Sequence, residues 1–185
     1  MNEQPLKLNL GCSDHILAGW INVDCRPKPG VDVAWNLDNQ PWPWADNSAD
    51  EIFIAHCLEH LKDHIAAMNE MGRILKPGGL LRVIVPHANG MMAHYPGHHH
   101  VFCPYWFYAW RNSSDCQIAI PGFFPVQSFY LAMWHHRYLR TWKERLVWGS
   151  IERVGNASWF AQFAWQMSGL FPPNEIRWQS RKVMT

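Results

Sequence analysis

Hydrophobic residues near the start of the chain recur at every second position, which is typical of short β-strands. Leu6, Leu8 and Leu10 alternate with polar residues, and Gly11 follows them where the chain must turn. Ile21 and Val23 flank Asn22 in a second strand-like segment, which places Asp24 at its end. The pattern therefore predicts two strands joined by a tight turn, with a carboxylate at the end of the second strand.

A longer apolar pattern with helical spacing follows two further predicted strands, at residues 31–35 and 51–55. From Cys57 to Leu75, leucine, isoleucine and methionine residues recur at steps of three and four, which predicts one helix packed against a sheet. The sequence KPGG ends this helix, and residues 80–85 predict a fifth strand. Strand, helix and strand in this order indicate parallel pairing, so we expect an α/β, Rossmann-like, doubly wound sheet.

The second half of the chain gives weaker patterns. Residues 104–111 and 131–147 predict helices, and the second of these carries an aromatic and aliphatic stripe beside arginine residues. Such a stripe is also typical of plain core packing. Residues 175–183 alternate, which predicts a last strand paired antiparallel at the sheet edge.

Charge divides the chain in the same way. Residues 1–90 hold seven Lys and Arg against eleven Asp and Glu, whereas residues 91–185 hold nine against four, so the halves carry −4 and +5 and sum to +1. The basic, aromatic second half favours an anionic or aromatic substrate, although arginines that cover a tryptophan core explain it equally well. Five cysteines without a CxxC pair indicate reduced thiols, and no signal peptide or transmembrane run is visible, so we expect a cytoplasmic protein.

The first two strands suggest a nucleotide-like ligand. In a doubly wound sheet the ligand binds at the carboxyl ends of the strands, over a glycine, with an acidic residue gripping the ribose hydroxyls. Gly11 and Asp24 occupy these two places. Taken alone this signal is weak, because an aspartate after a strand is usually a turn former.

Several linked motifs make the assignment more specific. The order LNLGC, GWINVD, WNLD, PWPWADNSADEI, AHCLEHL and MGRILKPGGLLRVIVP, over about residues 6–90, resembles the class I S-adenosylmethionine-dependent methyltransferases. The resemblance implies S-adenosylmethionine as cofactor and transfer of its methyl group to an acceptor. The length of 185 residues indicates one domain, and within it we expect the cofactor-binding core at 1–90, a helical, aromatic-rich substrate cap at 91–170 and a terminal strand at 171–185.

The resemblance places the cofactor between the first strands and the fourth. The residues that we expect to bind it are Asn9, Leu10, Gly11, Cys12, Ser13, Asp24, Asn36, Leu37 and His56. Asn36 replaces the aspartate that in this family commonly meets the adenine amino group. The glycine-rich turn also departs from the family pattern, because Asn9, Ser13 and His15 stand at its acidic position and at its second and third glycines. Either the loop is reshaped or the affinity for the cofactor is lowered.

Two histidines are the expected catalytic residues, because an imidazole with a pKa near 6.5 can act as a general base at neutral pH. His56 follows the fourth strand, where methyl group and acceptor should meet; a role in orienting the cofactor or bracing the turn is the alternative. His98 lies in Tyr95-Pro96-Gly97-His98, where the family branch often carries Asp-Pro-x-His. His60 is expected to be structural.

Histidines at positions 94, 98, 99 and 100 also raise the question of a metal. Adjacent histidines cannot all face one ion, and no carboxylate partner or HExxH motif stands near them in the sequence. We therefore expect no functional metal site, only incidental binding of divalent ions.

The expected activity is methyl transfer to an oxygen or nitrogen of a small molecule, with nucleic acid an improbable substrate. The chain lacks the Asn/Asp-Pro-Pro-aromatic pattern of amino methyltransferases that act on DNA, and it lacks a Pro-Cys nucleophile pair. Two alternatives stay open: a catalytically silent binding or regulatory subunit with the same fold, and a protein of the membrane interface.

Overall fold

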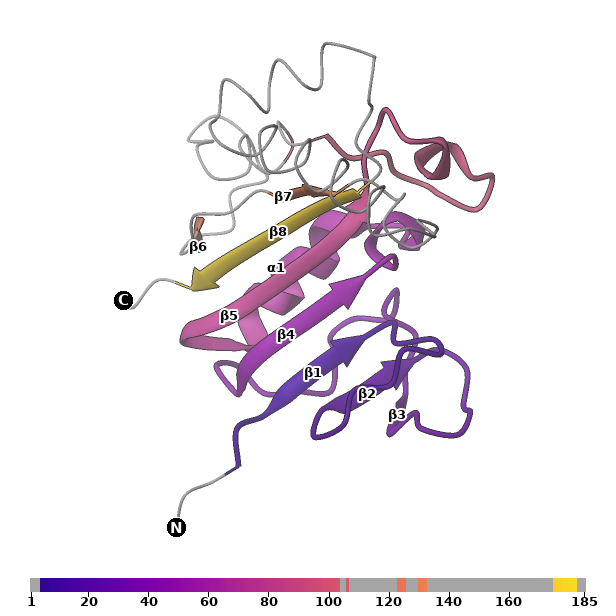
Figure 1. Ribbon diagram of the computed structural model, residues 1–185. Coiled ribbons are helices and arrows are strands. Elements are labelled where there is room, and N and C mark those ends of the chain that lie inside the picture. The colour runs from indigo at the N-terminus through magenta and orange to yellow at the C-terminus, as the bar shows by residue number, and fades with distance from the viewer. Residues whose placement is uncertain (1–3, 104–105, 107–122, 126–129, 133–174, 183–185) are drawn as a thin grey trace, which may run out of the picture.

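The computed structural model describes residues 4–103, 106, 123–125, 130–132 and 175–182. They form one eight-stranded sheet with strand order β3-β2-β1-β4-β5-β8-β6, in which β7 also pairs with β8 (Figure 1). The elements in chain order are β1 (Lys7–Leu10), β2 (Ile21–Asp24), β3 (Val33–Ala34), β4 (Ala49–Ala55), η1 (Leu58–His60), α1 (His64–Ile74), β5 (Leu75–Pro86), η2 (Met91–His94), β6 (Phe123–Pro125), β7 (Tyr130–Ala132) and β8 (Glu175–Lys182).

The sheet is mostly parallel with an antiparallel last strand, as the sequence predicts. β1, β2, β3, β4 and β5 pair in parallel, and β8 runs antiparallel to β5 over seven residue pairs. The prediction that the last strand lies at the sheet edge is wrong, because β6 and β7 pair with the other side of β8. The last strand is therefore an interior strand of the sheet.

The predicted single helix from Cys57 to Leu75 is wrong at its start. A short 3-10 helix, η1, comes first, and α1 begins only at His64. Asp63 is the N-cap of α1, and its Oδ1 accepts a hydrogen bond from the Ala66 N–H at 2.9 Å. An aspartate that caps a helix satisfies one of the free N–H groups of the first turn, so it favours a start there over continuation from the preceding turn.

The predicted helix at 131–147 is contradicted at its first two residues, because Leu131 and Ala132 belong to β7. The rest of this helix and nearly all of the one at 104–111 lie outside the described residues. The same holds for most of the cap at 91–170, so the division of the chain into core, cap and terminal strand stays a prediction.

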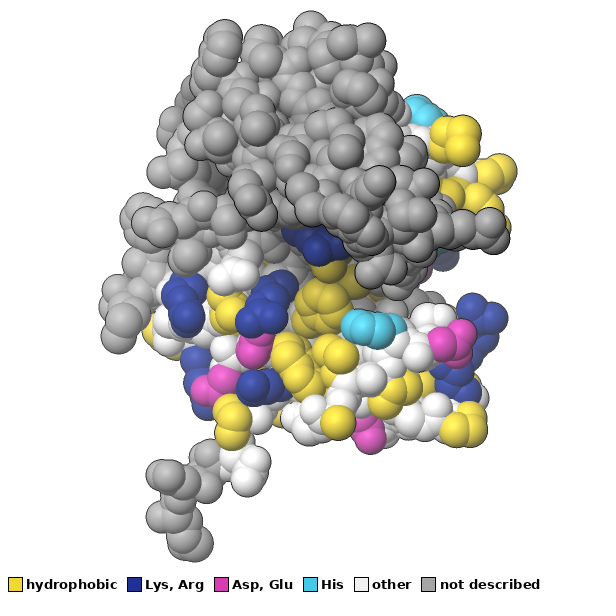
Figure 2. Space-filling model, in the orientation of Figure 1, with side chains coloured by type: hydrophobic (Ala, Val, Ile, Leu, Met, Phe, Trp, Pro, Cys, Tyr) yellow, Lys and Arg dark blue, Asp and Glu magenta, His cyan; other side chains and the backbone are white. Residues whose placement is uncertain are grey.

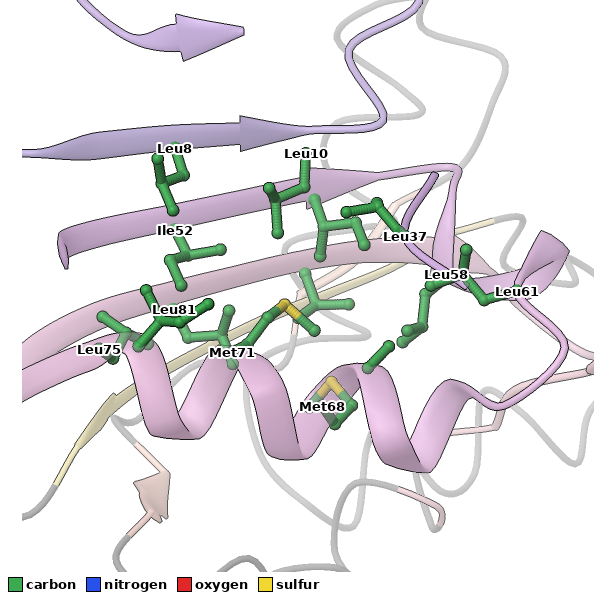
Figure 3. Close-up of a cluster of buried hydrophobic side chains, with 14 of the residues drawn as sticks. Leu8, Leu10, Leu37, Ile52, Leu58, Leu61, Met68, Met71, Leu75 and Leu81 are labelled. Atoms are coloured by element: carbon green, nitrogen blue, oxygen red, sulfur yellow. The ribbon is translucent and has the colours of Figure 1, made fainter. Parts of the chain in front are cut away.

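The core lies between the sheet and α1 (Figure 3). The strand register stacks fully buried side chains in two rows: Leu8, Ile52 and Leu81, and beside them Leu10, Ile54 and Val83. Met68, Met71 and Ile74 of α1, spaced by three residues, are buried against this face. Each fully buried side chain of this size contributes about 1.5–3 kcal/mol, so these contacts fix the strand ends that carry the site.

The opposite face of the sheet is more mixed in character. Figure 2 shows Lys and Arg side chains together with hydrophobic ones over the strands of this face. Phe53 packs edge-on against Trp20 and His15 of the β1–β2 connection, and Lys7 lies over the Trp20 ring. Within the part of the chain that the structure describes, no helix is long and apolar enough to cross a membrane.

Candidate active site

The turn after β1 and the end of β2 meet at the carboxyl edge of the sheet. Asp24 is nearly buried, and its Oδ2 accepts the Ser13 N–H at 2.9 Å while Oδ1 accepts the Arg26 N–H at 3.0 Å. Burial alone would raise the pKa of the Asp24 carboxyl, but these two N–H groups, together with the Cys25 thiol and the charge of Lys28, outweigh it and lower the pKa. Asp24 is therefore an ionised carboxylate held in one orientation at the end of β2.

Two residues of the turn have left-handed backbone conformations. Gly11 has φ +63° and Ser13 has φ 44°. This conformation costs a residue other than glycine about 1–2 kcal/mol. The hydrogen bond from the Ser13 N–H to Asp24 helps to hold Ser13 in it. The turn thus keeps a backbone shape that suits glycine, although a serine occupies the family's glycine position.

Gly11 is required by the neighbouring strand. A Cβ on this residue would lie 2.6 Å from the Cβ of Cys57 and would overlap its Sγ. Cys57 follows β4, so the missing side chain lets the ends of β1 and β4 approach closely. Burial raises the pKa of the Cys57 thiol, and burial likewise raises that of Cys12, so neither is a nucleophilic thiolate at neutral pH.

Three of the expected cofactor residues direct their side chains into the protein. Asn9 is 2% exposed, and its Nδ2 donates to the His15 carbonyl and to Asn22 Oδ1, each at 2.8 Å. Leu10 and Cys12 are also buried. Asn9 therefore ties β1 to β2 and to the turn between them, and these three residues can meet a ligand at this edge only through their backbone.

Asn36 and Leu37 follow β3. The Asn36 side chain is exposed, and its Oδ1 accepts the Asp38 N–H at 3.0 Å. Leu37 is in the core, and its carbonyl accepts the indole N–H of Trp42 at 3.0 Å. The Asn36 amide is available to a ligand at the sheet edge, whereas the Leu37 side chain packs beneath it.

His56 lies between two carboxylates. Its Nε2 is 3.2 Å from Glu175 Oε1 of β8, and its Nδ1 is 3.6 Å from Glu59 Oε1 of η1. Burial opposes protonation of the ring, but Glu175 and Glu59 outweigh it and raise the pKa of His56 to about 9. The ring is then an imidazolium at neutral pH and has no free lone pair, which argues against the expected role of a general base.

His98 lies on a loop that is held against η1. The backbone carbonyl of Glu59 accepts the N–H groups of His99 and His100, and the ring of His98 stands edge-on to that of His60 at 4.5 Å. Burial is the main cause that lowers the pKa of His98, so this ring is neutral at pH 7. The structure thus brings His98 to the same corner as His56, with Glu59 near both.

Two acidic residues of this corner were missed by the sequence analysis. Glu175 is 119 positions from His56 in the sequence, and no local pattern signals the pairing. Glu59 belongs to the LEHL motif, and its side chain is 1% exposed. A buried carboxylate is uncommon unless it is paired, but burial cannot be read from a polar position in a short helix.

The edge formed by β1, β2 and β4 fits S-adenosylmethionine. An ionised carboxylate has about four acceptor positions; on Asp24 two backbone N–H groups and the Cys25 thiol use three of them, so it retains acceptor capacity for a ribose hydroxyl and can take a second in place of the weak thiol contact. The exposed Asn36 amide lies past the end of the neighbouring strand β3. The residues present thus match the expected donors and acceptors of the cofactor.

Comparisons with known proteins agree with this geometry. Residues 26–83 match the model of the methyltransferase domain family. A demethylmenaquinone methyltransferase of Corynebacterium glutamicum is 44% identical over 46 residues, which cover 25% of this chain and 20% of that protein. The chain thus matches about a fifth of the length of this curated relative.

Solved structures share the fold. A SAM-dependent methyltransferase from Archaeoglobus fulgidus superposes with a TM-score of 0.60 at 17% identity, covering 96% of this chain and 86% of that one. The [4+2]-cyclase SpnF superposes with a TM-score of 0.59 at 15% identity, covering 100% and 77%. Residues 26–83 thus match a methyltransferase domain, and the chain has the fold of the S-adenosylmethionine-dependent methyltransferases.

Proposed function

We propose that this protein transfers a methyl group from S-adenosylmethionine to an oxygen or nitrogen of a small molecule. The observation that carries the proposal is Asp24, an ionised and oriented carboxylate at the end of β2, beside the left-handed turn at Gly11. When bound, S-adenosylmethionine supplies an electrophilic methyl group on its sulfonium sulfur.

The residues at the sheet edge bind different parts of the cofactor and the acceptor. Asp24 accepts the ribose hydroxyls, the backbone from Leu10 to Ser13 approaches the methionine part, and Asn36 accepts from the adenine amino group. His56 acts as a fixed cation at the end of β4, because its pKa of about 9 keeps it protonated. A cation there favours an anionic acceptor, and it orients such an acceptor rather than removing its proton.

The acceptor binds to residues of the segment after residue 90, because this basic half of the chain attracts an anionic molecule. The relative from Corynebacterium glutamicum is named for demethylmenaquinone, so a quinone-type aromatic ring is one acceptor to test. Small aromatic acids and phenols complete the panel, because they combine an aromatic ring with an anionic group.

The cofactor assignment is tested by calorimetry with Asp24→Ala. Two charge-assisted hydrogen bonds are worth about 1.5–3 kcal/mol each, so affinity for S-adenosylmethionine should fall by at least 100-fold. The matched control is Asp32→Ala, since Asp32 also braces a strand by accepting the N–H of Asn22, at 2.7 Å. A folded Asp24→Ala protein with unchanged affinity would contradict the assignment.

A second function is favoured by the likeness to SpnF, which is named as a cyclase although it has the same fold. One fold supports several activities, so this chain can also bind the cofactor without transferring methyl groups. Formation of S-adenosylhomocysteine in the presence of the acceptor panel separates the two functions. Tight cofactor binding with no product across the panel supports the silent subunit.

A further inference from the structure

We propose that Glu59, His60 and His98 form a binding site for a divalent first-row metal cation such as Zn²⁺. One ligand atom from each of the three residues lies within 4.8 Å of the other two. The cluster joins η1 to the loop before Phe102, and its Glu59 also faces His56 at the end of β4.

Glu59 is the observation that points to a cation. Its side chain is 1% exposed, and within the described ranges neither carboxylate oxygen has a hydrogen-bond partner. His56 faces Oε1 at 3.6 Å, which is an ion pair without a hydrogen bond. A buried carboxylate normally has several partners, so this one retains unused acceptor capacity, most clearly at Oε2.

The two histidines each keep a nitrogen for the metal. His60 Nδ1 is 3.0 Å from the Gly97 carbonyl, which can only accept a hydrogen bond, so the proton is on Nδ1 and Nε2 keeps its lone pair. A backbone carbonyl that receives the other ring N–H is the usual support of a metal-binding histidine. His98 Nδ1 is buried and has no hydrogen-bond partner among the described residues.

The backbone holds the two segments together without the metal. Leu58 anchors η1 in the core, and the Glu59 carbonyl accepts the N–H of His99 at 2.8 Å and that of His100 at 3.3 Å. These bonds keep the neighbouring His98 over η1. Bonds of about 2.1 Å to a tetrahedral Zn²⁺ place ligand atoms about 3.4 Å apart, a spacing that the three side chains reach by rotation about their χ angles.

The donor set selects the kind of ion. Two imidazoles and one carboxylate suit Zn²⁺ and neighbouring transition metals, whereas Mg²⁺ and Ca²⁺ prefer oxygen ligands alone. Three protein ligands leave a fourth position of a tetrahedral ion open to water or another small ligand. The site therefore resembles open metal sites more than closed structural ones.

The experiment is calorimetric titration of chelator-treated protein with Zn²⁺. We expect one ion per chain, and a loss of affinity of at least about 10- to 100-fold in His60→Ala and in His98→Ala, since the loss of a mere supporting partner already costs that much. Glu59→Gln should weaken binding in the same way while it keeps the shape of the side chain. His60→Ala is the safest variant for folding, because His60 is exposed.

His99→Ala is the matched control, since His99 is an exposed histidine on the same loop and outside the cluster. Its affinity should stay within about threefold of wild type, and Zn²⁺ should raise the melting temperature of wild type and His99→Ala but not of His98→Ala. Equal losses in His98→Ala and His99→Ala would mean diffuse binding to a histidine-rich loop and would overturn the proposal. So would the absence of saturable binding below millimolar Zn²⁺. A parallel titration with S-adenosylmethionine reports on the cofactor site independently.

Discussion

Replacing Gly11 by alanine should destabilise the protein for two separable reasons. The left-handed backbone at φ +63° costs an alanine about 1–2 kcal/mol. The new Cβ would also lie 2.6 Å from the Cβ of Cys57, and overpacking of this kind costs about 1–3 kcal/mol. The free energy of unfolding should therefore fall by about 2–5 kcal/mol, measured from the midpoint and slope of urea denaturation.

The chain offers a control for each part of this cost. Gly19 is also left-handed, at φ +78°, but a Cβ there meets nothing within 4 Å, so Gly19→Ala should show the conformational cost alone. Cys57→Gly removes both atoms that clash with the new Cβ, because the Cys57 Cα is 4.0 Å away. The double variant should therefore recover about 1–3 kcal/mol relative to the sum of the single changes. Additive effects of Gly11→Ala and Cys57→Gly would refute the close contact between the ends of β1 and β4.

Three further predictions concern ionisable groups. Glu175→Gln should lower the pKa of His56 below about 9, because it removes the charge 3.2 Å from Nε2. NMR titration of the metal-free protein measures this pKa, and an unchanged value would contradict the pairing of His56 with Glu175. Glu70→Ala should lower the free energy of unfolding in urea by about 2–3 kcal/mol, since it leaves the buried Trp42 N–H without its acceptor. The control is Asp46→Ala, which removes an exposed partner of Arg73 and should lower it by at most about 1 kcal/mol. Burial lowers the pKa of His87 to about 4 in the folded chain, below the usual 6.5, so its contribution to stability is complete above about pH 6.5 and is lost toward pH 4. This loss amounts to about 3 kcal/mol, and His87→Gln should flatten the pH dependence of stability over that range; an equally steep decline in the variant would show that His87 is not its source.

The sequence predicted the parts of the fold that depend on local patterns. The alternation of Leu8 and Leu10 and the run that ends in Asp24 fix β1 and β2, because one face of each strand must be buried. The helix boundary was missed, because the apolar spacing continues through η1 while Asp63 restarts the helix by capping it. Apolar spacing indicates which face of a segment is buried, but it does not show where one helix ends and the next begins.

The candidate site was predictable only where one segment decides the chemistry. Asp24 stands where the motif and the strand place it, and its hydrogen bonds come from residues close in sequence. His56 was expected to be a base on the strength of the ordinary pKa of histidine. Glu59 and Glu175 raise the pKa of His56 instead, and the second of these comes from a distant strand. The long-range partner therefore changes the chemistry of a residue that the local sequence had placed correctly.

The interior position of β8 has a consequence for how the chain is made. During synthesis the long strand β5 has an open edge until residues 175–182 emerge, and an unpaired edge readily joins another chain. The ribosome must add 119 residues after His56 before Glu175 exists to face it. A nascent or truncated chain that has folded only β1 to β5 is therefore prone to aggregate, and it lacks one of the two carboxylates that keep His56 charged.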